Sequence, residues 1–289
     1  MNATQIAGPI VLFLLMSIVG LELTLDDFRR VARKPAAVLG GTVAQIVCLP
    51  LMTWVVVWLF DLNPVFGAGA VLVAVSPGAG ISNVLVAVAR GNVALSVSLT
   101  AFASVLAVVT MPTVASLGMQ LFLEGAGDVE VPVVGLFLQL VFMLLTPITL
   151  GMTLRSSRPD LADRIGPPLR RVTMVVMAVA VTVGALLADA QQLDLAGSGA
   201  ALLAAAVWTL SAMVIGWGTA RALGLDAADR FTFLIEFSAR NIAVSAIVAL
   251  SGLGRMDLTF FSGVYMLVGY PLAVVATLWR RRATRGRAG

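Results

Sequence analysis

Long uncharged stretches dominate this chain and constrain its fold more than any other feature. Eight of them contain no Asp, Glu, Lys or Arg, at residues 1–21, 35–60, 62–89, 91–123, 131–154, 172–188, 195–220 and 258–279. A helix needs roughly 20 apolar residues to cross a bilayer, and most of these stretches reach that length. A ninth stretch, residues 231–254, is equally apolar except for Glu236 and Arg240 inside it. The pattern predicts an all-α polytopic membrane protein with nine transmembrane helices.

The composition excludes several classes of function. The 289 residues include no His and a single Cys, Cys48, and 12% of them are charged, against roughly a quarter in a soluble domain. His-based catalysis, Cys/His metal sites and disulfide frameworks are therefore excluded. No polar segment is long enough to form a nucleotide-binding domain. We expect no enzymatic activity.

The positive charges lie on one side of the predicted membrane. Every Lys and Arg except Arg240 and Arg255 lies in alternate connections or in the C-terminal tail, whereas the opposite connections are acidic. Because Lys and Arg favour cytoplasmic loops, we expect a cytoplasmic C-terminus and an external N-terminus in a multi-pass inner or plasma membrane. The first stretch lacks a basic n-region, so we expect a retained helix rather than a signal peptide. The net charge of +4 then reports topology, and no nucleic-acid partner is expected.

The second to fourth and the seventh to ninth predicted spans share an order: a plain helix, a polar-interrupted helix and another helix. Ser82-Asn83 begins the apolar run after the first interruption, and Arg240-Asn241 begins the run after the second. The two units are five spans apart, so they would cross the membrane in opposite orientations. Inverted repeats with interrupted helices at matching positions are typical of secondary transporters whose site lies near the bilayer midplane.

The two interruptions differ in composition. The first, at residues 76–80, contains Pro77 and two glycines, so we expect the chain to unwind there and to line a buried cavity. A Pro-kinked helix without a ligand is the alternative. The second contains neither Gly nor Pro, and the sequence alone does not show whether it unwinds. Glu236 and Arg240 are costly inside a membrane, which indicates a function, although their i, i+4 spacing also permits an ion pair on a continuous helix.

Oxygen-bearing side chains within the spans suit a sodium ion, a hard cation that prefers several oxygen ligands. Ser96 and Thr100 are spaced i, i+4 and share a helix face, although such hydroxyls usually bond to carbonyls of their own helix. Gln45 lies in the middle of a span, where an amide must find a partner. A contact between helices is the alternative role for Gln45.

Several groups of residues form one pattern along the chain. They are Lys34-Pro35, Ala44-Gln45 with Leu49-Pro50, Pro77-Gly78-Ala79-Gly80-Ile81-Ser82-Asn83, Arg90-Gly91-Asn92-Val93-Ala94-Leu95-Ser96 with Thr100, and Glu236 with Asn241. In order and spacing this pattern resembles the bile acid:sodium symporter family, in its bacterial-type, nine-helix form. The resemblance covers nearly the whole chain, and its most specific part runs from Pro77 to Ser96.

The resemblance implies a panel domain and a core domain, with two broken helices that cross inside the core. The panel would contain the helices at approximately residues 3–22, 131–154 and 172–190. The core would contain the helices at approximately residues 35–60, 62–89, 92–123, 195–221, 231–254 and 256–279. Residues 1–289 would then form a single transmembrane transporter domain.

The resemblance also implies two sites for sodium as the coupling ion. The first would use Ser82, Asn83, Ser96, Thr100 and Glu236. The second would use Gln45, Glu236 and the carbonyls at Phe237 and Ala239, together with a glutamine whose position is occupied here by Arg240. A guanidinium accepts no hydrogen bond and would repel sodium. Three consequences stay open: Arg240 replaces the second cation, binds the anionic group of the substrate, or marks a loss of sodium coupling.

The activity implied by the resemblance is sodium-coupled symport of an organic anion, a carboxylate or a bile-acid-like compound, by alternating access. The substrate would lie nearest Gly80, Ile81, Arg240 and Asn241, where helix N-termini favour a carboxylate. A proton-coupled or uncoupled transporter or exporter of the same fold is the first alternative, and a membrane sensor or binding protein without transport is the second. The expected partners are the small organic anion and the lipid bilayer, without an obligate protein partner.

Overall fold

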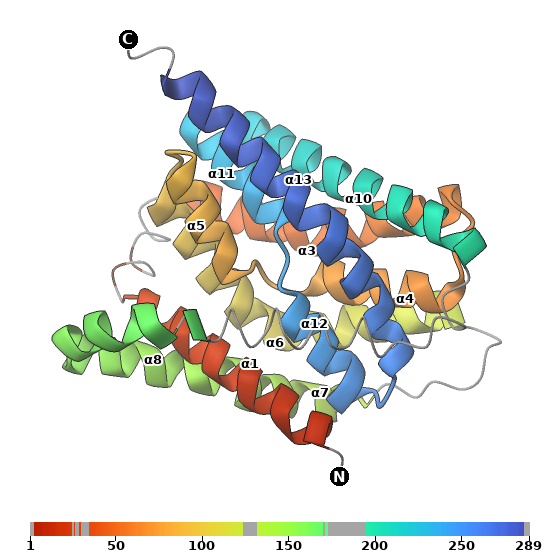
Figure 1. Ribbon diagram of the computed structural model, residues 1–289, viewed down its shortest axis with the longest axis horizontal. Helices are drawn as coiled ribbons and strands as arrows, with labels where there is room; N and C mark the ends of the chain where they lie inside the picture. The colour runs from red at the N-terminus through yellow and green to blue at the C-terminus, as the bar shows by residue number, and fades with distance from the viewer. Residues whose placement is uncertain are drawn as a thin grey trace.

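The computed structural model describes residues 3–24, 26, 29, 35–123, 132–169, 171, 172 and 195–285 (Figure 1). Within these residues no extended strand occurs, which confirms the all-α prediction. The named elements are α1 (Ala3–Glu22), α3 (Pro35–Leu59), α4 (Pro64–Val75), α5 (Gly80–Val88), α6 (Val93–Leu123), α7 (Val133–Leu140), η1 (Val141–Leu145), α8 (Thr146–Ser157), α10 (Leu195–Ala222), α11 (Ala227–Ser238), α12 (Ile242–Ile247), η2 (Val248–Gly252), η3 (Met256–Thr259) and α13 (Phe260–Arg285). The predicted panel helix at residues 172–190 lies almost wholly outside the described residues.

Five helical segments are long and apolar enough to cross a bilayer. They are Pro35–Leu59, Val93–Leu123, Val133–Ser157, Gly199–Ala222 and Met256–Thr284. Large apolar side chains on the outer surface are exposed, among them Trp58 at 78% and Val134 at 72%. Soluble monomers rarely expose extensive apolar surface. The length of the helices and the apolar exterior therefore fit a protein that lies in lipid.

The predicted interruption at residues 76–80 separates α4 from α5. α4 ends at Val75, and α5 begins at Gly80. Ser76 is extended, with φ −63° and ψ 150°, and the next residue, Pro77, has no N–H to continue the helical hydrogen bonds. The chain unwinds here, as the Pro and Gly residues predict.

The second interruption separates α11 from α12, and its cause lies in α13. α11 ends at Ser238, and α12 begins at Ile242. The hydroxyl of Tyr265 donates a hydrogen bond to the carbonyl of Ser238 and accepts one from the Arg240 N–H at 3.0 Å. The hydroxyl of Tyr270 donates to the carbonyl of Arg240 at 2.7 Å. These tyrosines pair backbone groups that the broken helix leaves open, so the interruption needs neither Gly nor Pro.

The two unwound segments lie side by side and hydrogen-bond to each other in antiparallel fashion. The N–H of Ala79 donates to the carbonyl of Ala239 at 3.0 Å, and the N–H of Asn241 donates to the carbonyl of Pro77 at 2.9 Å. In Figure 1, α5 and α11 lie toward one end of the molecule and α4 and α12 toward the other. Four helix ends therefore meet around one buried crossing.

α1 and α8 pack with unusually close backbones. A Cβ atom at Gly20 would overlap the carbonyl oxygen of Ile148, and one at Gly151 would overlap the carbonyl oxygen of Ser17. Small residues permit this approach between membrane helices. In Figure 1, α1, α7 and α8 form a group along one side of the molecule, whereas α3, α10 and α13 lie along the opposite side.

An aromatic cluster behind the crossing holds Tyr265 in place. The indole Nε1 of Trp208 donates to the hydroxyl of Thr53 at 2.8 Å. The Trp208 ring meets the rings of Phe261 and Tyr265 edge-on, at centroid distances of 6.1 and 5.3 Å. Because Tyr265 is 0% exposed and surrounded by rings, its hydroxyl has a fixed position from which to bond the unwound backbone.

Candidate functional site

The carboxylate of Glu236 lies at the crossing and is 0% exposed. It accepts hydrogen bonds from Ser82 Oγ at 2.5 Å, Ser96 Oγ at 2.5 Å and Thr100 Oγ1 at 2.9 Å. Ser96 Oγ also lies 2.8 Å from Asn83 Oδ1. The structure thus brings together, from α5, α6 and α11, the five residues that the family resemblance implies for a first sodium site. We call them the Glu236 cluster.

The Glu236 cluster contains more acceptors than protons. Ser82 Oγ lies 2.7 Å from the carbonyl of Ala79 as well as near the carboxylate. The three hydroxyl protons therefore face four acceptor atoms, namely both Glu236 oxygens, Asn83 Oδ1 and the Ala79 carbonyl. One carboxylate among neutral oxygens suits a monovalent hard cation. In the described part of the chain, no group of three or more His, Cys, Asp or Glu is placed to hold a transition metal.

Gly78 closes one side of the Glu236 cluster. A Cβ atom at this position would lie 2.7 Å from Glu236 Oε2 and 3.0 Å from Thr100 Oγ1. No real Cβ approaches a neighbour this closely without displacing it. The sequence indicated Gly78 as a helix breaker. The structure adds a second reason for glycine at this position, because the carboxylate of Glu236 occupies the space that a side chain would need.

The guanidinium of Arg240 donates its hydrogen bonds to a ring of neutral oxygens rather than to the carboxylate of Glu236. One NH group of its guanidinium donates to Gln45 Oε1 at 2.8 Å and to the Glu236 carbonyl at 3.3 Å. The other donates to the carbonyls of Ala74, at 3.4 Å, and Ser76. Arg240 is 2% exposed. The alternative of an ion pair on a continuous helix is wrong, because α11 ends between the two residues.

The second predicted sodium site is rearranged by this arginine. Gln45 is present and 1% exposed, but its amide oxygen accepts from Arg240. The carbonyl of Ala239 accepts from Ala79 in the crossing, and Phe237 lies in the last turn of α11 and is 0% exposed. The guanidinium thus bonds to the amide that was expected to bind the ion, and the residues present do not fit a second sodium ion.

The residues expected near the substrate lie at the two unwound segments. Gly80 and Ile81 begin α5 and are partly buried, and Asn241 is 7% exposed and caps α12 by accepting from the Val244 N–H at 3.3 Å. A Cβ at Gly80 would lie 3.5 Å from Val19 of α1. This end of the crossing therefore faces α1.

Tyr265 and Tyr270 are site residues that sequence reasoning missed. They are the only two tyrosines in the chain, and both hydroxyls bond to the unwound backbone at Arg240. A phenol inside an apolar span needs a hydrogen-bond partner. That requirement was a usable signal, but it does not show which backbone group the phenol contacts.

Comparison with known proteins places this geometry in a family. The model of the sodium bile acid symporter family matches residues 9–194. A probable chloroplastic sodium/metabolite cotransporter of Arabidopsis thaliana, BASS1, is 29% identical over 92% of this chain and 65% of its own length. An uncharacterized sodium-dependent transporter of Bacillus subtilis, YocS, is 28% identical over 99% and 87%. The human hepatic sodium/bile acid cotransporter is 24% identical over 93% and 78%.

The chain spans 65% of the length of the Arabidopsis relative and 56% of that of a rice relative with the same description. The family match includes the residues of α5 and α6 that contribute to the Glu236 cluster, whereas Glu236 and Arg240 lie beyond the matched range. The match covers more than half of the chain, and the helices are long and apolar enough for a bilayer. The chain is a membrane protein that belongs to the sodium bile acid symporter family, a family of transporters.

Proposed function

We propose that this protein is a secondary active transporter that couples sodium to the symport of an organic anion, a carboxylate or a bile-acid-like compound. The observation that carries the proposal is the Glu236 cluster, in which one buried carboxylate and four neutral side-chain oxygens converge at the crossing. The names of the relatives, sodium/metabolite and sodium/bile acid cotransporters, support the same coupling ion and substrate class.

Sodium would act by joining three helices. Its ligands come from α5 (Ser82, Asn83), α6 (Ser96, Thr100) and α11 (Glu236), so a bound ion would hold the start of α5 in one position. Each hydroxyl would turn a lone pair toward the ion, which relieves the excess of acceptors. Gly80 and Ile81 lie next to Ser82, so a substrate there would bind best when the ion is present. Ion and substrate would thereby increase each other's affinity.

The architecture that we propose is nine transmembrane helices in a panel and a core, with inverted repeats and alternating access. The close packing of α1 on α8 supports a separate panel, and the two interrupted helices support a site at the repeat interface. No side-chain cap bonds the start of α5, whose N-terminus would favour a carboxylate. The charge pattern supports a multi-pass cell membrane location with the N-terminus outside and the C-terminus in the cytoplasm.

Proton coupling is the second candidate, because the carboxylate of Glu236 is buried and surrounded by hydroxyls that would also solvate a protonated acid. An uncoupled exporter, or a membrane sensor without transport, would use the same fold. Uptake by proteoliposomes separates these functions. We expect accumulation of monocarboxylates or bile acids that requires an inward sodium gradient and persists when the pH gradient is abolished.

The site itself is tested by thermal stability of the purified protein in detergent. Sodium chloride should raise the melting temperature in a saturable manner, whereas potassium chloride and choline chloride at equal ionic strength should not. Glu236→Gln keeps the shape and removes the charge, so it should abolish the rise. Asp257→Asn, at a surface carboxylate paired with Arg255, serves as the matched control. Equal stabilisation by choline, or a full sodium response in Glu236→Gln, contradicts the proposal.

A further inference from the structure

Four oxygens converge on the guanidinium of Arg240, and none of them belongs to a carboxylate. They are Gln45 Oε1 and the carbonyl oxygens of Ala74, Ser76 and Glu236. A buried cation normally lies against an anion that offsets its desolvation. Here the hydrogen bonds of the guanidinium go to neutral oxygens. These oxygens attract one positive charge through their dipoles, although none of them carries a negative charge.

Helix geometry explains why these carbonyls attract a cation. Ala74 and Ser76 lie at the C-terminal end of α4, and Glu236 lies in the last turn of α11. The last carbonyls of a helix have no donor within the helix, and the helix dipole places about half a negative charge at that end. Two helix C-termini therefore face one buried point. In transporters with interrupted helices, such ends coordinate coupling cations.

We infer that Arg240 acts as a covalently held cation at this position, so that the Glu236 cluster binds the single exchangeable sodium ion of each transport cycle. This inference rests on the sodium-coupled function proposed above. It also selects one of the three consequences expected from the sequence, namely that Arg240 replaces the second cation. Both NH groups of the guanidinium are directed to oxygens of the protein rather than to a cavity, and the Glu236 cluster keeps its oxygens.

The charges then determine the electrical character of transport. The negative charge of Glu236 and the positive charge of Arg240 cancel, and one sodium ion adds one positive charge. A monovalent organic anion cancels that charge, so the loaded carrier is neutral at the crossing. Transport of a monovalent anion should therefore be insensitive to the membrane potential.

The test counts bound sodium by equilibrium binding of radioactive sodium to the purified protein at constant ionic strength. The wild type should bind one ion per molecule. Arg240→Gln removes the charge and adds an amide oxygen, so this variant should bind two. Arg240→Lys keeps a cation in place and should bind one. Arg255→Gln, at an exposed pair with Asp257, is the matched control and should also bind one.

The outcomes separate this inference from the proposed function. Two ions bound by the wild type, or one ion bound by a folded Arg240→Gln with unchanged affinity, overturns the role of Arg240. If Arg240→Gln does not fold, the number of sodium ions bound by the wild type and by Arg240→Lys tests the inference. Each should bind one ion, and two ions bound by either overturns it. The absence of sodium binding in every variant overturns the sodium coupling itself.

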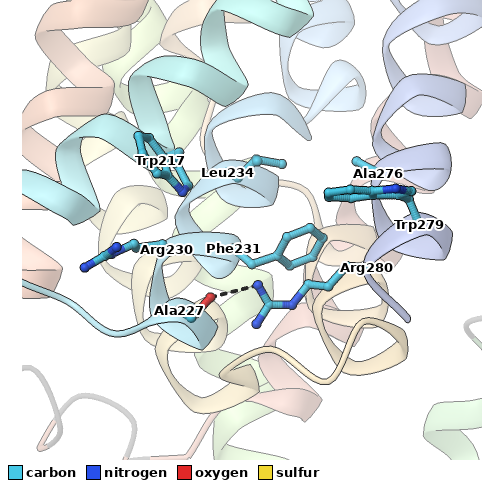
Figure 2. Close-up of a pocket in the computed structure, with 8 residues that line it drawn as sticks. All are labelled: Trp217, Ala227, Arg230, Phe231, Leu234, Ala276, Trp279 and Arg280. Carbon is cyan, nitrogen blue, oxygen red and sulfur yellow. Dashed lines mark hydrogen bonds between the residues drawn. The ribbon is translucent and has the colours of Figure 1, made fainter. Parts of the chain in front are cut away.

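A different observation carries a second inference, at a pocket of about 290 Å³ between α10, α11 and α13 (Figure 2). It is lined by Trp217, Ala227, Arg230, Phe231, Leu234, Ala276, Trp279 and Arg280. Figure 2 shows the indoles of Trp217 and Trp279 on opposite sides of Phe231 and Leu234. Trp279 is 73% exposed. Tryptophans at helix ends are typical of the boundary between lipid and water.

Two arginines line this pocket, and Figure 2 shows the guanidinium of Arg280 beside Phe231 and that of Arg230 directed away from it. The guanidinium of Arg280 stacks on Phe231 at 4.5 Å and donates to the Ala227 carbonyl at 2.7 Å. Its Nε is buried without a hydrogen-bond partner among the described residues. Asp226 accepts from the N–H groups of Ala228 and Asp229 as the cap of α11, and its negative charge also acts on Arg280. The pocket therefore combines a mainly apolar lining with the guanidinium of Arg280.

We infer that this pocket binds an anionic phospholipid, with its phosphate at Arg280 and an acyl chain between the two tryptophans. Basic pockets between helices at the cytoplasmic surface favour such headgroups, and the apolar lining suits the chain. The occupant would stabilise the contact between α11, which supplies Glu236, and α13, which supplies Tyr265.

Native mass spectrometry of delipidated protein tests this site. With equimolar phosphatidylglycerol and phosphatidylcholine, the wild type should retain severalfold more phosphatidylglycerol. Arg280→Gln and Trp279→Ala should remove the preference, whereas Arg255→Gln should keep it. Equal retention of both lipids overturns the inference. Displacement of phosphatidylglycerol by inorganic phosphate, with Trp279→Ala unaffected, identifies a free-anion site and overturns it as well.

Discussion

Gly78→Ala should damage the Glu236 cluster without changing its chemistry. The added methyl carbon would lie 2.7 Å from Glu236 Oε2 and 3.0 Å from Thr100 Oγ1. The φ angle of Gly78 lies outside the left-handed region, so alanine can adopt the backbone conformation. The effect of the substitution therefore comes from the contact with the carboxylate, which must shift by several tenths of an ångström.

The magnitude follows from the cost of overpacking a rigid site. Inserting one methyl group into a well-packed interior costs about 1–3 kcal/mol. Relief of the contact moves Oε2 away from its place in the cluster, so most of this cost should oppose sodium binding. Since about 1.4 kcal/mol corresponds to a tenfold change in affinity, we expect sodium affinity to fall by roughly five- to a hundredfold.

The assay is a sodium titration of purified protein, read by binding of radioactive sodium. Gly218→Ala is the matched control, because a Cβ atom at Gly218 in α10 would meet nothing within 4 Å. This control should bind sodium like the wild type and should be slightly more stable, by up to about 1 kcal/mol, since alanine favours a helix. Unchanged sodium affinity in a folded Gly78→Ala would refute the placement of the ion beside Glu236.

Five further substitutions, two of them as comparisons, test the second interruption, the ion site and the aromatic cluster. Tyr265→Phe removes both hydrogen bonds of its hydroxyl at the second interruption and should lower stability by about 2–4 kcal/mol, whereas Tyr270→Phe removes one and should cost about half as much. A smaller loss for Tyr265→Phe than for Tyr270→Phe contradicts the assigned roles. Thr100→Ala should weaken sodium binding at least severalfold, and Thr113→Ala, whose hydroxyl bonds only to its own helix, should not. Trp208→Phe deletes the bond to Thr53 and should lower the melting temperature while leaving the sodium count unchanged.

The sequence predicted those features whose cause is local. The length of the uncharged runs predicted the helices, and Pro77 with Gly78 predicted the first interruption. The i, i+4 spacing of Ser96 and Thr100 placed both hydroxyls on one face of α6, and both contact Glu236. Each of these predictions depends on residues that are neighbours along one helix.

The sequence did not predict features whose cause lies on another helix. Nothing in residues 236–241 shows that α11 ends at Ser238, because the groups that pair the open backbone there come from Tyr265 and Tyr270 on α13. The sequence also did not show which groups the side chain of Arg240 contacts. Its spacing from Glu236 permitted an ion pair, and only the three-dimensional arrangement shows the guanidinium against Gln45 and the end of α4. The packing that forms this ring of oxygens joins residues about 160 to 200 positions apart.

The most direct test of the central claim is sodium binding to Glu236→Gln beside the wild type. The claim is that a carboxylate at the crossing, with the hydroxyls of Ser82, Ser96 and Thr100, holds the coupling ion. Removing one negative charge while keeping the shape should abolish saturable binding of radioactive sodium and leave the fold intact by size-exclusion chromatography. Saturable binding by Glu236→Gln with the affinity of the wild type would show that the ion binds elsewhere and would contradict the account.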